Sequence, residues 1–200
     1  MITVYTKSYS PPPLDRKEIL RYMGAREETD GLRDILTECI AEAQSALSYK
    51  LCYTELPIEI LGDEVDFGFA RVNSHGLAKR LENCQSAILF GATVGVGIDR
   101  LALKAAVGSQ VRELAFSALG TERIEALCDE FCKEQRQLLS AAGYGIKPRF
   151  SPGYSDLKID FQKEFFAALE CQKHIGLTLN DSLLMSPKKS VTAIVGVYKL

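Results

Sequence analysis

A helical pattern of apolar residues runs from about Asp99 to Ala142, with a break at Gly108 and a weaker one at Gly120. Gly143 then ends the pattern, as glycine commonly does after the last turn of a helix. Elsewhere in the chain the predicted strands and helices do not alternate one for one, which repeated β–α–β units require. The sequence therefore favours an α+β fold with an antiparallel or mixed sheet.

The other helices and strands are predicted from capping residues and apolar spacing. Asp15 and Ser74 can each cap a short helix, and apolar positions three and four residues apart predict another helix from Thr29 or Asp30 to Leu47. A last helix is predicted at 161–175, and the predicted strands are 2–5, 49–61 with 65–69 as a hairpin, 87–90 in the centre of the sheet, and 190–198. No repeat or linker divides the chain, so one domain over residues 1–200 is expected.

Charge and hydropathy exclude several classes of protein. Lysine plus arginine number 24 and aspartate plus glutamate 26, so the net charge is -2 and no surplus of cations is present for nucleic acid phosphates. The longest apolar stretches fall short of the about 20 residues that cross a bilayer, and the start, MITVYTKSYSPPP, does not resemble a secretion signal. We therefore expect a cytoplasmic protein without nucleic acid or membrane partners.

The six cysteines are expected to be reduced and mostly buried, because they lie in apolar segments of a chain without a secretion signal. Cys128 and Cys132 are four residues apart on the long helical region, a spacing that places two thiols on one face for a metal. The only histidines, His75 and His174, are distant in sequence from this pair, and no C-x-x-C motif occurs. Structural thiols are therefore favoured over a metal or redox site.

Three glycines, Gly91, Gly95 and Gly97, lie between the predicted central strand and the long helical region. Their G-x-x-x-G-x-G spacing resembles the cofactor turn of short-chain dehydrogenases, and similar turns bind S-adenosylmethionine in Rossmann methyltransferases. Such a turn needs a second strand that ends in an acidic residue about 20 residues later, where this sequence continues as helix. A tight turn in the core is therefore favoured, and a Rossmann-type oxidoreductase is the less favoured alternative.

A polar loop after the long helical region combines several ligand-binding groups within six residues. Arg149 offers a planar guanidinium for a carboxylate, and the backbone from Ser151 through Pro152 to Gly153 offers hydrogen bonds to an amino group or a heterocycle. Tyr154 can stack on a ligand or donate a hydrogen bond to it. Taken alone, a Pro-Gly loop is more often only a turn.

This loop and its flanks resemble the activation domain of vitamin B12-dependent methionine synthase. The family motif R-x-x-P-G-Y is present at 149–154, and the segment from His174 to Ala193 is similar to the end of the family's sequence. Arg123 falls on the arginine of the family's long helix. The resemblance is best over residues 86–197 and looser over 1–85.

The resemblance implies a bent antiparallel sheet flanked by long helices, with S-adenosylmethionine bound at the loop. It implies that Arg149 engages the ligand's carboxylate, that Ser151, Pro152 and Gly153 provide backbone contacts, and that Tyr154 lies by the reactive end. In the family, the domain restores methylcobalamin from inactive cob(II)alamin, with an electron from a flavodoxin-like donor and a methyl group from S-adenosylmethionine. An accessory component of a methyltransferase system is thus implied, and not an independent enzyme.

Arg123 is a weaker candidate for ligand binding, because two acidic residues of the family are missing. The position three residues after Arg123 is Ala126, with Glu125 beside it, and the position six residues before Arg149 is Gly143. The sequence also has no D-x-H-x-x-G cobalamin motif, so the chain is expected to act in trans on a cobalamin-bound methionine synthase that lacks its own activation domain. The missing acids leave an alternative open: a non-catalytic scaffold protein of the same fold without ligand.

Overall fold

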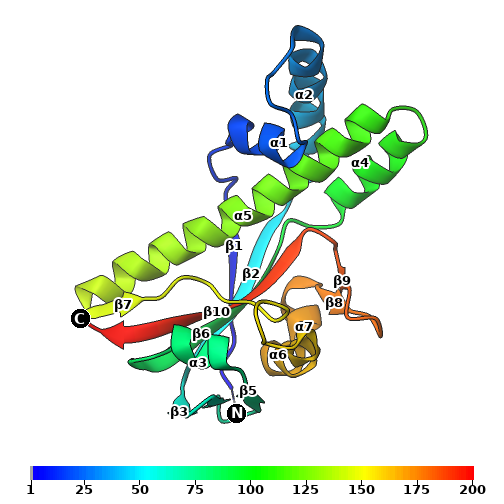
Figure 1. The fold of residues 1–200 in the computed structure, drawn as a ribbon. Helices are drawn as coiled ribbons and strands as arrows, with labels where there is room; N and C mark the ends of the chain where they lie inside the picture. The colour runs from blue at the N-terminus through cyan, green and yellow to red at the C-terminus, as the bar shows by residue number, and fades with distance from the viewer. Residues whose placement is uncertain (1) are drawn as a thin grey trace.

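The computed structural model describes residues 2–200, and Figure 1 shows the order of its elements. The helices are α1 (Arg16–Tyr22), α2 (Asp30–Ala43), α3 (His75–Arg80), α4 (Gly97–Ala106), α5 (Gln110–Ala141), the 3-10 turn η1 (Ile159–Phe161), α6 (Gln162–Leu169) and α7 (Cys171–Ile175). The strands are β1 (Tyr5–Tyr9), β2 (Tyr49–Pro57), β3 (Glu59–Leu61), β4 (Glu64–Asp66), β5 (Arg71–Asn73), β6 (Cys84–Thr93), β7 (Tyr144–Ile146), β8 (Thr178–Leu179), β9 (Met185–Ser186) and β10 (Ser190–Lys199).

A five-stranded sheet in the order β1-β2-β6-β10-β7 forms the centre of the molecule, and all its neighbouring strands are antiparallel. The sheet is curled, with α5 crossing one side and α3, α6 and α7 on the other (Figure 1). Strands β3, β4 and β5 form a separate small sheet, and β8 pairs with β9. The predicted α+β class, with a bent antiparallel sheet and long helices, is confirmed.

Strand β6 is covered on both faces, because its side chains alternate between two cores. Ile88 and Phe90 pack in the core that α2, α4 and α5 share, whereas Ala87 and Leu89 pack in the core that α3, α6 and α7 share. All four side chains are at most 1% exposed. The central strand predicted at 87–90 is confirmed, and the structure makes it longer.

The long helical region is divided where the sequence predicts, at Gly108 between α4 and α5. Gly120 instead lies inside α5 and allows close packing, because a Cβ there would lie 2.8 Å from Lys189 Cγ and 3.1 Å from Ile98 Cγ1. Gly143 ends the region with a φ of +83°, which glycine adopts without strain. Neither the 32-residue α5 nor any other helix of residues 2–200 is apolar over enough length to cross a membrane.

Three elements differ clearly from their sequence predictions. The strand predicted at 49–61 is divided into β2 and β3, and only β3 forms the hairpin with the second predicted strand, which is β4 and shorter than 65–69. The first strand covers Tyr5–Tyr9 and not 2–5, because those later residues are the ones that pair with β2. The last predicted helix is divided into α6 and α7 at Glu170, whose φ is +45°. This change of direction allows Leu169 and Cys171, on either side of it, to be fully buried.

The glycine-rich segment after β6 is a tight turn against the connection between α2 and β2. A Cβ on Gly97 would overlap the backbone oxygen of Ala46, and a Cβ on Gly95 would overlap Ser48 Oγ. Both neighbours of β6 are antiparallel, whereas a dinucleotide-binding fold needs parallel strands. The Rossmann alternative is therefore wrong, and Gly95 and Gly97 serve close packing. Gly91 is not part of the turn but lies inside β6, where a Cβ would lie 3.1 Å from Cys171 Sγ.

Candidate functional site

The loop predicted to bind a ligand is fixed to the central sheet before it turns. Phe150 forms an antiparallel bridge with Ile194 of β10, with hydrogen bonds of 2.9 and 2.7 Å. The next four residues form a type II turn, in which the N–H of Tyr154 donates to the Ser151 carbonyl oxygen at 3.0 Å and Gly153 has a φ of +89°. The Pro-Gly turn expected from the sequence is therefore present on a rigid support.

Arg149 lies directly before this turn and reaches toward α5. Its Nη2 donates to Asp129 Oδ1 at 2.8 Å and to Glu125 Oε2 at 3.0 Å. Burial lowers the pKa of Arg149, but neighbouring groups, including these two carboxylates, raise it overall, so the guanidinium is a permanent cation. Both bonds start from one nitrogen of a group with five N–H donors. Arg149 therefore retains donors for a ligand carboxylate.

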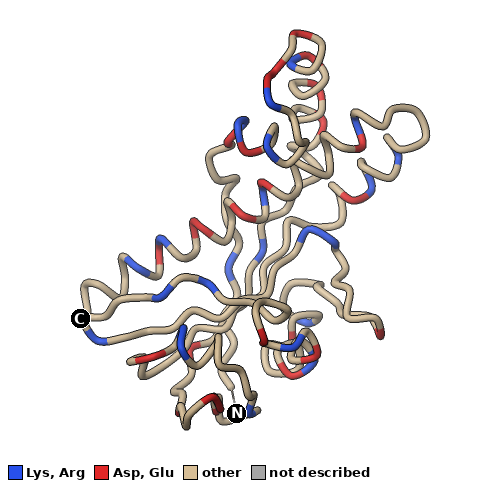
Figure 2. Tube along the Cα trace, viewed as in Figure 1, with Lys and Arg blue, Asp and Glu red and all other residues tan. Residues whose placement is uncertain are grey.

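An acidic groove of about 420 Å³ lies between α1 and α5. We define the acidic groove by its lining residues: Pro12, Pro13, Asp15, Glu18, Tyr22, Glu122, Glu125, Ala126, Asp129, Glu130 and Lys133. Six of these side chains are acidic and only Lys133 is basic, although both charges occur along α5 as a whole (Figure 2). Because Glu125 and Asp129 hold Arg149, the groove offers carboxylates for cationic groups next to a guanidinium for an anionic one.

Arg123 is buried beneath the proline wall of this groove, with 2% of its surface exposed. Its Nη1 donates to the Pro12 carbonyl oxygen at 2.7 Å and its Nη2 to the Pro13 carbonyl oxygen at 2.8 Å. It also forms an ion pair with Glu122, which accepts a hydrogen bond from the backbone N–H of Asp15 at 2.9 Å. The guanidinium of Arg123 is therefore taken up by protein partners and fixes the groove wall to α5.

The two positions where family acids are missing have different surroundings. Ala126 lines the acidic groove, and the adjacent Glu125 both lines the groove and contacts Arg149. Gly143 ends α5 with a positive φ, so a side chain there would be strained. At residue 126 the family's acidic side chain is thus replaced by that of the neighbouring Glu125. At residue 143, glycine is needed for the backbone conformation that ends α5.

The turn itself offers carbonyl oxygens and an aromatic ring. The N–H of Gly153 donates to the Leu157 carbonyl oxygen at 2.8 Å, and the N–H of Tyr154 is used within the turn. Because carbonyl oxygens accept two hydrogen bonds, the backbone contacts expected from 151–153 would come from these oxygens. Pro152 is buried, whereas Tyr154 is 70% exposed and its ring meets the edge of Phe150 at a centroid distance of 6.3 Å.

The sequence interpretation missed three residues that shape this site. Glu125 and Asp129 are four residues apart on a helix, and this spacing was the available signal that they share one face for a cation. Asp156 accepts hydrogen bonds from Ser74 and from the first two residues of α3, which lie 80 to 82 residues earlier in the chain. No local pattern predicts a contact over that separation.

All six cysteines are free, and five of them are buried, whereas Cys84 is partly exposed. Burial raises the pKa of Cys132 to about 11 and that of Cys128 further, so both thiols stay neutral. Cys52 and Cys171 approach each other in the core with their sulfur atoms 3.9 Å apart. Within residues 2–200, no group of three or more His, Cys, Asp or Glu side chains is placed to hold a metal ion.

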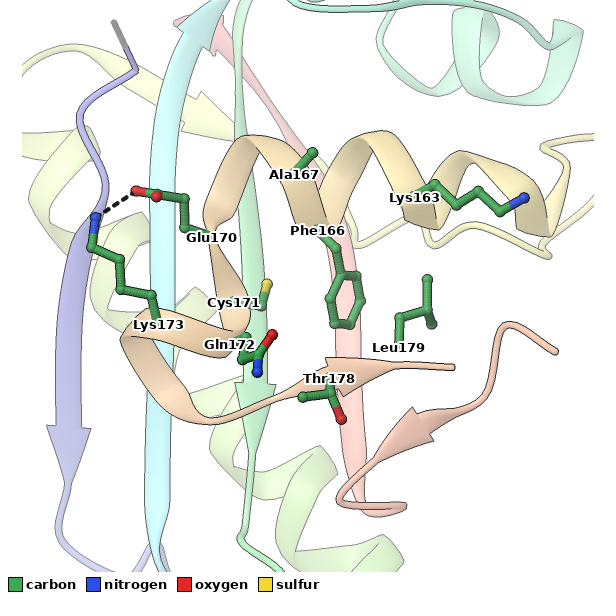
Figure 3. A pocket seen from close by; sticks show the side chains of 9 residues that line it. All are labelled: Lys163, Phe166, Ala167, Glu170, Cys171, Gln172, Lys173, Thr178 and Leu179. Atoms are coloured by element: carbon green, nitrogen blue, oxygen red, sulfur yellow. Dashed lines mark hydrogen bonds and ion pairs between the residues drawn. The ribbon is translucent and has the colours of Figure 1, made fainter. Parts of the chain in front are cut away.

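A separate pocket of about 720 Å³ is formed by α6, α7 and β8 (Figure 3). Glu170 and Lys173 form an ion pair of 2.9 Å at one end of it, and Phe166 and Leu179 line its other part (Figure 3). None of the six site residues predicted from the sequence lines this pocket, and none lines the acidic groove itself. Arg149, however, contacts two residues of the acidic groove, Glu125 and Asp129. The candidate site is therefore the Arg149 loop with the acidic groove.

The fold and the site together define an α+β module with a curled antiparallel sheet and an arginine-bearing Pro-Gly loop beside an acidic groove. One solved structure with this fold is described as the crystal structure of the MetH reactivation domain bound to AdoHcy, with a TM-score of 0.71 and 16% sequence identity. The superposition covers 98% of this chain and 78% of that chain. The resemblance to the methionine synthase activation domain is thus confirmed in the fold.

Sequence comparison adds no closer assignment. No family model matches the chain. No curated protein matches it either. The likeness at 16% identity establishes a shared fold, and the functional argument depends on the site itself.

Proposed function

We propose that this protein binds S-adenosylmethionine at the Arg149 loop and reactivates a cobalamin-dependent methionine synthase in trans. Residues 1–200 would act as one activation-domain-like unit on a cobalamin-bound methionine synthase that lacks such a domain. A flavodoxin-like protein is the electron donor in this proposal, and bound S-adenosylmethionine supplies the methyl group. The protein's own residues bind and orient the ligand and do not act as acid, base or nucleophile.

The observation that carries this proposal is Arg149, a permanent cation beside a rigid Pro-Gly turn. A guanidinium binds a carboxylate through two parallel charge-assisted hydrogen bonds, and the methionyl part of S-adenosylmethionine ends in a carboxylate. The fold supports this interpretation, because a domain of the same architecture was solved with AdoHcy, which carries the same carboxylate.

The acidic groove supports the choice of S-adenosylmethionine among carboxylate ligands. S-adenosylmethionine carries two positive charges, on its ammonium and its sulfonium, next to the carboxylate. Glu125 and Asp129 border the groove within 3.0 Å of Arg149, so groups of both signs are available side by side. We therefore expect S-adenosylmethionine to bind more tightly than AdoHcy, which lacks the sulfonium charge, and the difference to shrink as salt is added.

The turn supports the remaining contacts. The carbonyl oxygens of Ser151, Pro152 and Gly153 can accept hydrogen bonds from an amino group, and the exposed ring of Tyr154 can stack on a planar base. Arg123 enters the proposal only indirectly, because its guanidinium holds the Pro12 and Pro13 wall of the acidic groove.

Calorimetric titration with S-adenosylmethionine and a reactivation assay test this function together. We expect one saturable site and faster recovery of activity when the protein is added to cob(II)alamin methionine synthase from the same source with an electron donor and S-adenosylmethionine. Equal recovery with and without the protein would contradict the repair function. Absence of any heat or thermal shift at millimolar ligand would contradict ligand binding.

One observation favours a second candidate, a scaffold protein of the same fold that binds no ligand. Arg149 already contacts two carboxylates, and the N–H groups of Gly153 and Tyr154 are used inside the turn. In that case the methionine synthase would still associate with the protein, but S-adenosylmethionine would not change the association. A pull-down of the two proteins with and without S-adenosylmethionine separates the two functions.

A further inference from the structure

The side chain of Asp156 connects the ligand loop to the start of α3. Its Oδ1 accepts hydrogen bonds from Ser74 Oγ at 2.6 Å and from the N–H of Gly76 at 3.0 Å, and its Oδ2 accepts one from the N–H of His75 at 2.7 Å. Asp156 follows Tyr154 by two residues. The contact therefore joins the proposed binding loop to a part of the fold that is distant in sequence.

Gly76 makes this close approach possible. A Cβ at that position would lie 2.8 Å from Ser155 Oγ and 2.9 Å from Asp156 Oδ1. Real Cβ atoms do not approach other atoms so closely, so any side chain at residue 76 would force the side chains of Ser155 and Asp156 out of these positions. The surface of α3 and the loop are thus fitted to each other at this point.

The loop around Asp156 is held in an uncommon conformation. Ser155 has a φ of +53°, which is unfavourable for a residue other than glycine and persists only where the surroundings enforce it. Residues 153–156 are exposed, so burial in the core does not enforce it. Two backbone hydrogen bonds, from the N–H of Gly153 to the Leu157 carbonyl oxygen at 2.8 Å and from the N–H of Leu157 to the Tyr154 carbonyl oxygen at 3.0 Å, restrain this segment from within. The three hydrogen bonds of Asp156 are its side-chain attachment to the rest of the fold between the buried Pro152 and Leu157.

Helix α3 depends on Asp156 less than the loop does. Ser74 also caps α3 by accepting a hydrogen bond from the N–H of Leu77 at 3.1 Å. Leu77 is fully buried and Ala78 is 6% exposed. Since a cap and the core both hold α3, the helix is a fixed support and the loop is the part that Asp156 holds in place.

We propose that Asp156 is a positioning residue, which sets the place of Tyr154 and the Pro-Gly turn for ligand binding by fastening the loop to α3. This inference rests on the proposed function of the loop as the S-adenosylmethionine site. The pKa of Asp156 is lowered, first by the hydrogen bond from Ser74, so the ionised acceptor is the form present at neutral pH.

The first experiment measures S-adenosylmethionine binding by calorimetry. We expect Asp156→Ala to weaken binding roughly tenfold, the effect typical of losing hydrogen bonds to a charged group, with Asp156→Asn in between. Ser74→Ala and Gly76→Ala disturb the same contact from α3 and should weaken binding in the same direction. Asp160→Asn, at an exposed aspartate four residues further along the chain, is the matched control and should bind like the wild type.

The second experiment follows the loop without any ligand. The chain contains no tryptophan, so Tyr154→Trp provides a single fluorescent reporter on the loop. We expect Asp156→Ala in this background to lower the fluorescence anisotropy of the reporter and to speed up cleavage of the loop by a protease. Asp160→Asn should leave both unchanged, and circular dichroism checks that every variant is folded.

The outcomes distinguish this inference from the proposed function. Wild-type affinity in Asp156→Ala, or an unchanged reporter, would overturn the positioning role even if the wild type binds the ligand. If the wild type does not bind S-adenosylmethionine but Asp156→Ala still loosens the loop, the proposed function fails and the fastening role of Asp156 stands. If Asp156→Ala does not fold, Ser74→Ala and Asp156→Asn decide by the same two measurements.

Discussion

The Nη2 atom of Arg149 lies 2.8 Å from Asp129 Oδ1, so the cation proposed for the ligand is paired with a carboxylate of α5. The side chain of Asp129 is 72% exposed and that of Arg149 is 24% exposed. An exposed ion pair of this kind contributes at most about 1 kcal/mol. A ligand carboxylate that makes two parallel bonds to the guanidinium can therefore replace Asp129 at a small cost.

Replacement of Arg149 tests directly whether its guanidinium binds the ligand's carboxylate. Charge-assisted hydrogen bonds contribute about 1.5 to 3 kcal/mol, so Arg149→Ala should weaken S-adenosylmethionine binding about 10- to 150-fold. Arg149→Lys should weaken it almost as much, because an ammonium cannot form the two parallel bonds. Calorimetry measures both, with Arg136→Ala, at an exposed arginine of α5, as the control. Full affinity in Arg149→Lys would show that only the charge matters.

Replacement of Asp129 tests whether its carboxylate competes with the ligand's carboxylate for Arg149. Asp129→Asn frees a donor of Arg149 but also removes a carboxylate that favours the sulfonium charge, so we expect AdoHcy to bind up to about fivefold more tightly and S-adenosylmethionine to gain less. Asp34→Asn, at an exposed position of α2, controls for the change in net charge. A weaker affinity for AdoHcy in Asp129→Asn would contradict competition and would mean that Asp129 orients Arg149.

The Pro-Gly turn requires glycine at position 153. Its φ is +89°, and a Cβ would lie 3.1 Å from Ile159 Cδ1, so Gly153→Ala should distort the turn and Gly153→Val should distort it more. We expect both variants to lose ligand affinity, with valine the worse. Gly62→Ala, at a positive φ of 65° with open space around it, introduces similar strain on a different turn. The thermal stability of Gly62→Ala should fall about as much as that of Gly153→Ala, but its ligand affinity should equal that of the wild type.

The thiols should react in the order of their exposure. Cys84 is partly exposed and the other five cysteines are buried, so a thiol reagent at about pH 8 should modify Cys84 first and the rest only on unfolding. Cys84→Ser should remove the fast phase. Denatured protein that was kept reduced should give six thiols in total. A count of four would contradict this and would point to Cys52 and Cys171, whose sulfur atoms are 3.9 Å apart.

Local signals in the sequence predicted the parts of this fold that local contacts determine. Asp15 and Ser74 cap their helices as their positions suggest, because a cap needs only the next two or three residues. The role of Arg123 could not be predicted, because its partners are carbonyl oxygens 110 and 111 residues away. The contact between Arg149 and Glu125 likewise could not be predicted, because it depends on how α5 lies against the loop. Only the assembled sheet determines that arrangement.

The attachment of β1 to α5 should make stability depend on pH at both extremes. Glu134 accepts hydrogen bonds from Lys7 Nζ and from the Tyr9 hydroxyl, the latter at 2.7 Å, and so connects the edge strand to the long helix. The hydrogen bond from Lys7 is the main cause that lowers the pKa of Glu134 below its ordinary value of 4.5. Burial, followed by the hydrogen bond to Glu134, raises the pKa of Tyr9 above its ordinary value of 10.0.

A carboxyl group whose pKa is lower in the folded state stabilises the protein above its unfolded pKa, and this stability is lost as the pH falls. A tyrosine whose pKa is raised has the opposite sign, so its contribution is present below about pH 10 and is lost above it. Urea unfolding should therefore show a plateau between about pH 5 and pH 10, with stability falling on both sides. Glu134→Gln should lower the plateau by roughly 0.2 to 1 kcal/mol, since the ion pair is partly exposed, and should converge on the wild type in acid. A wild type and a Glu134→Gln variant that differ equally at every pH would contradict this account, because the difference would then not depend on the charge of Glu134.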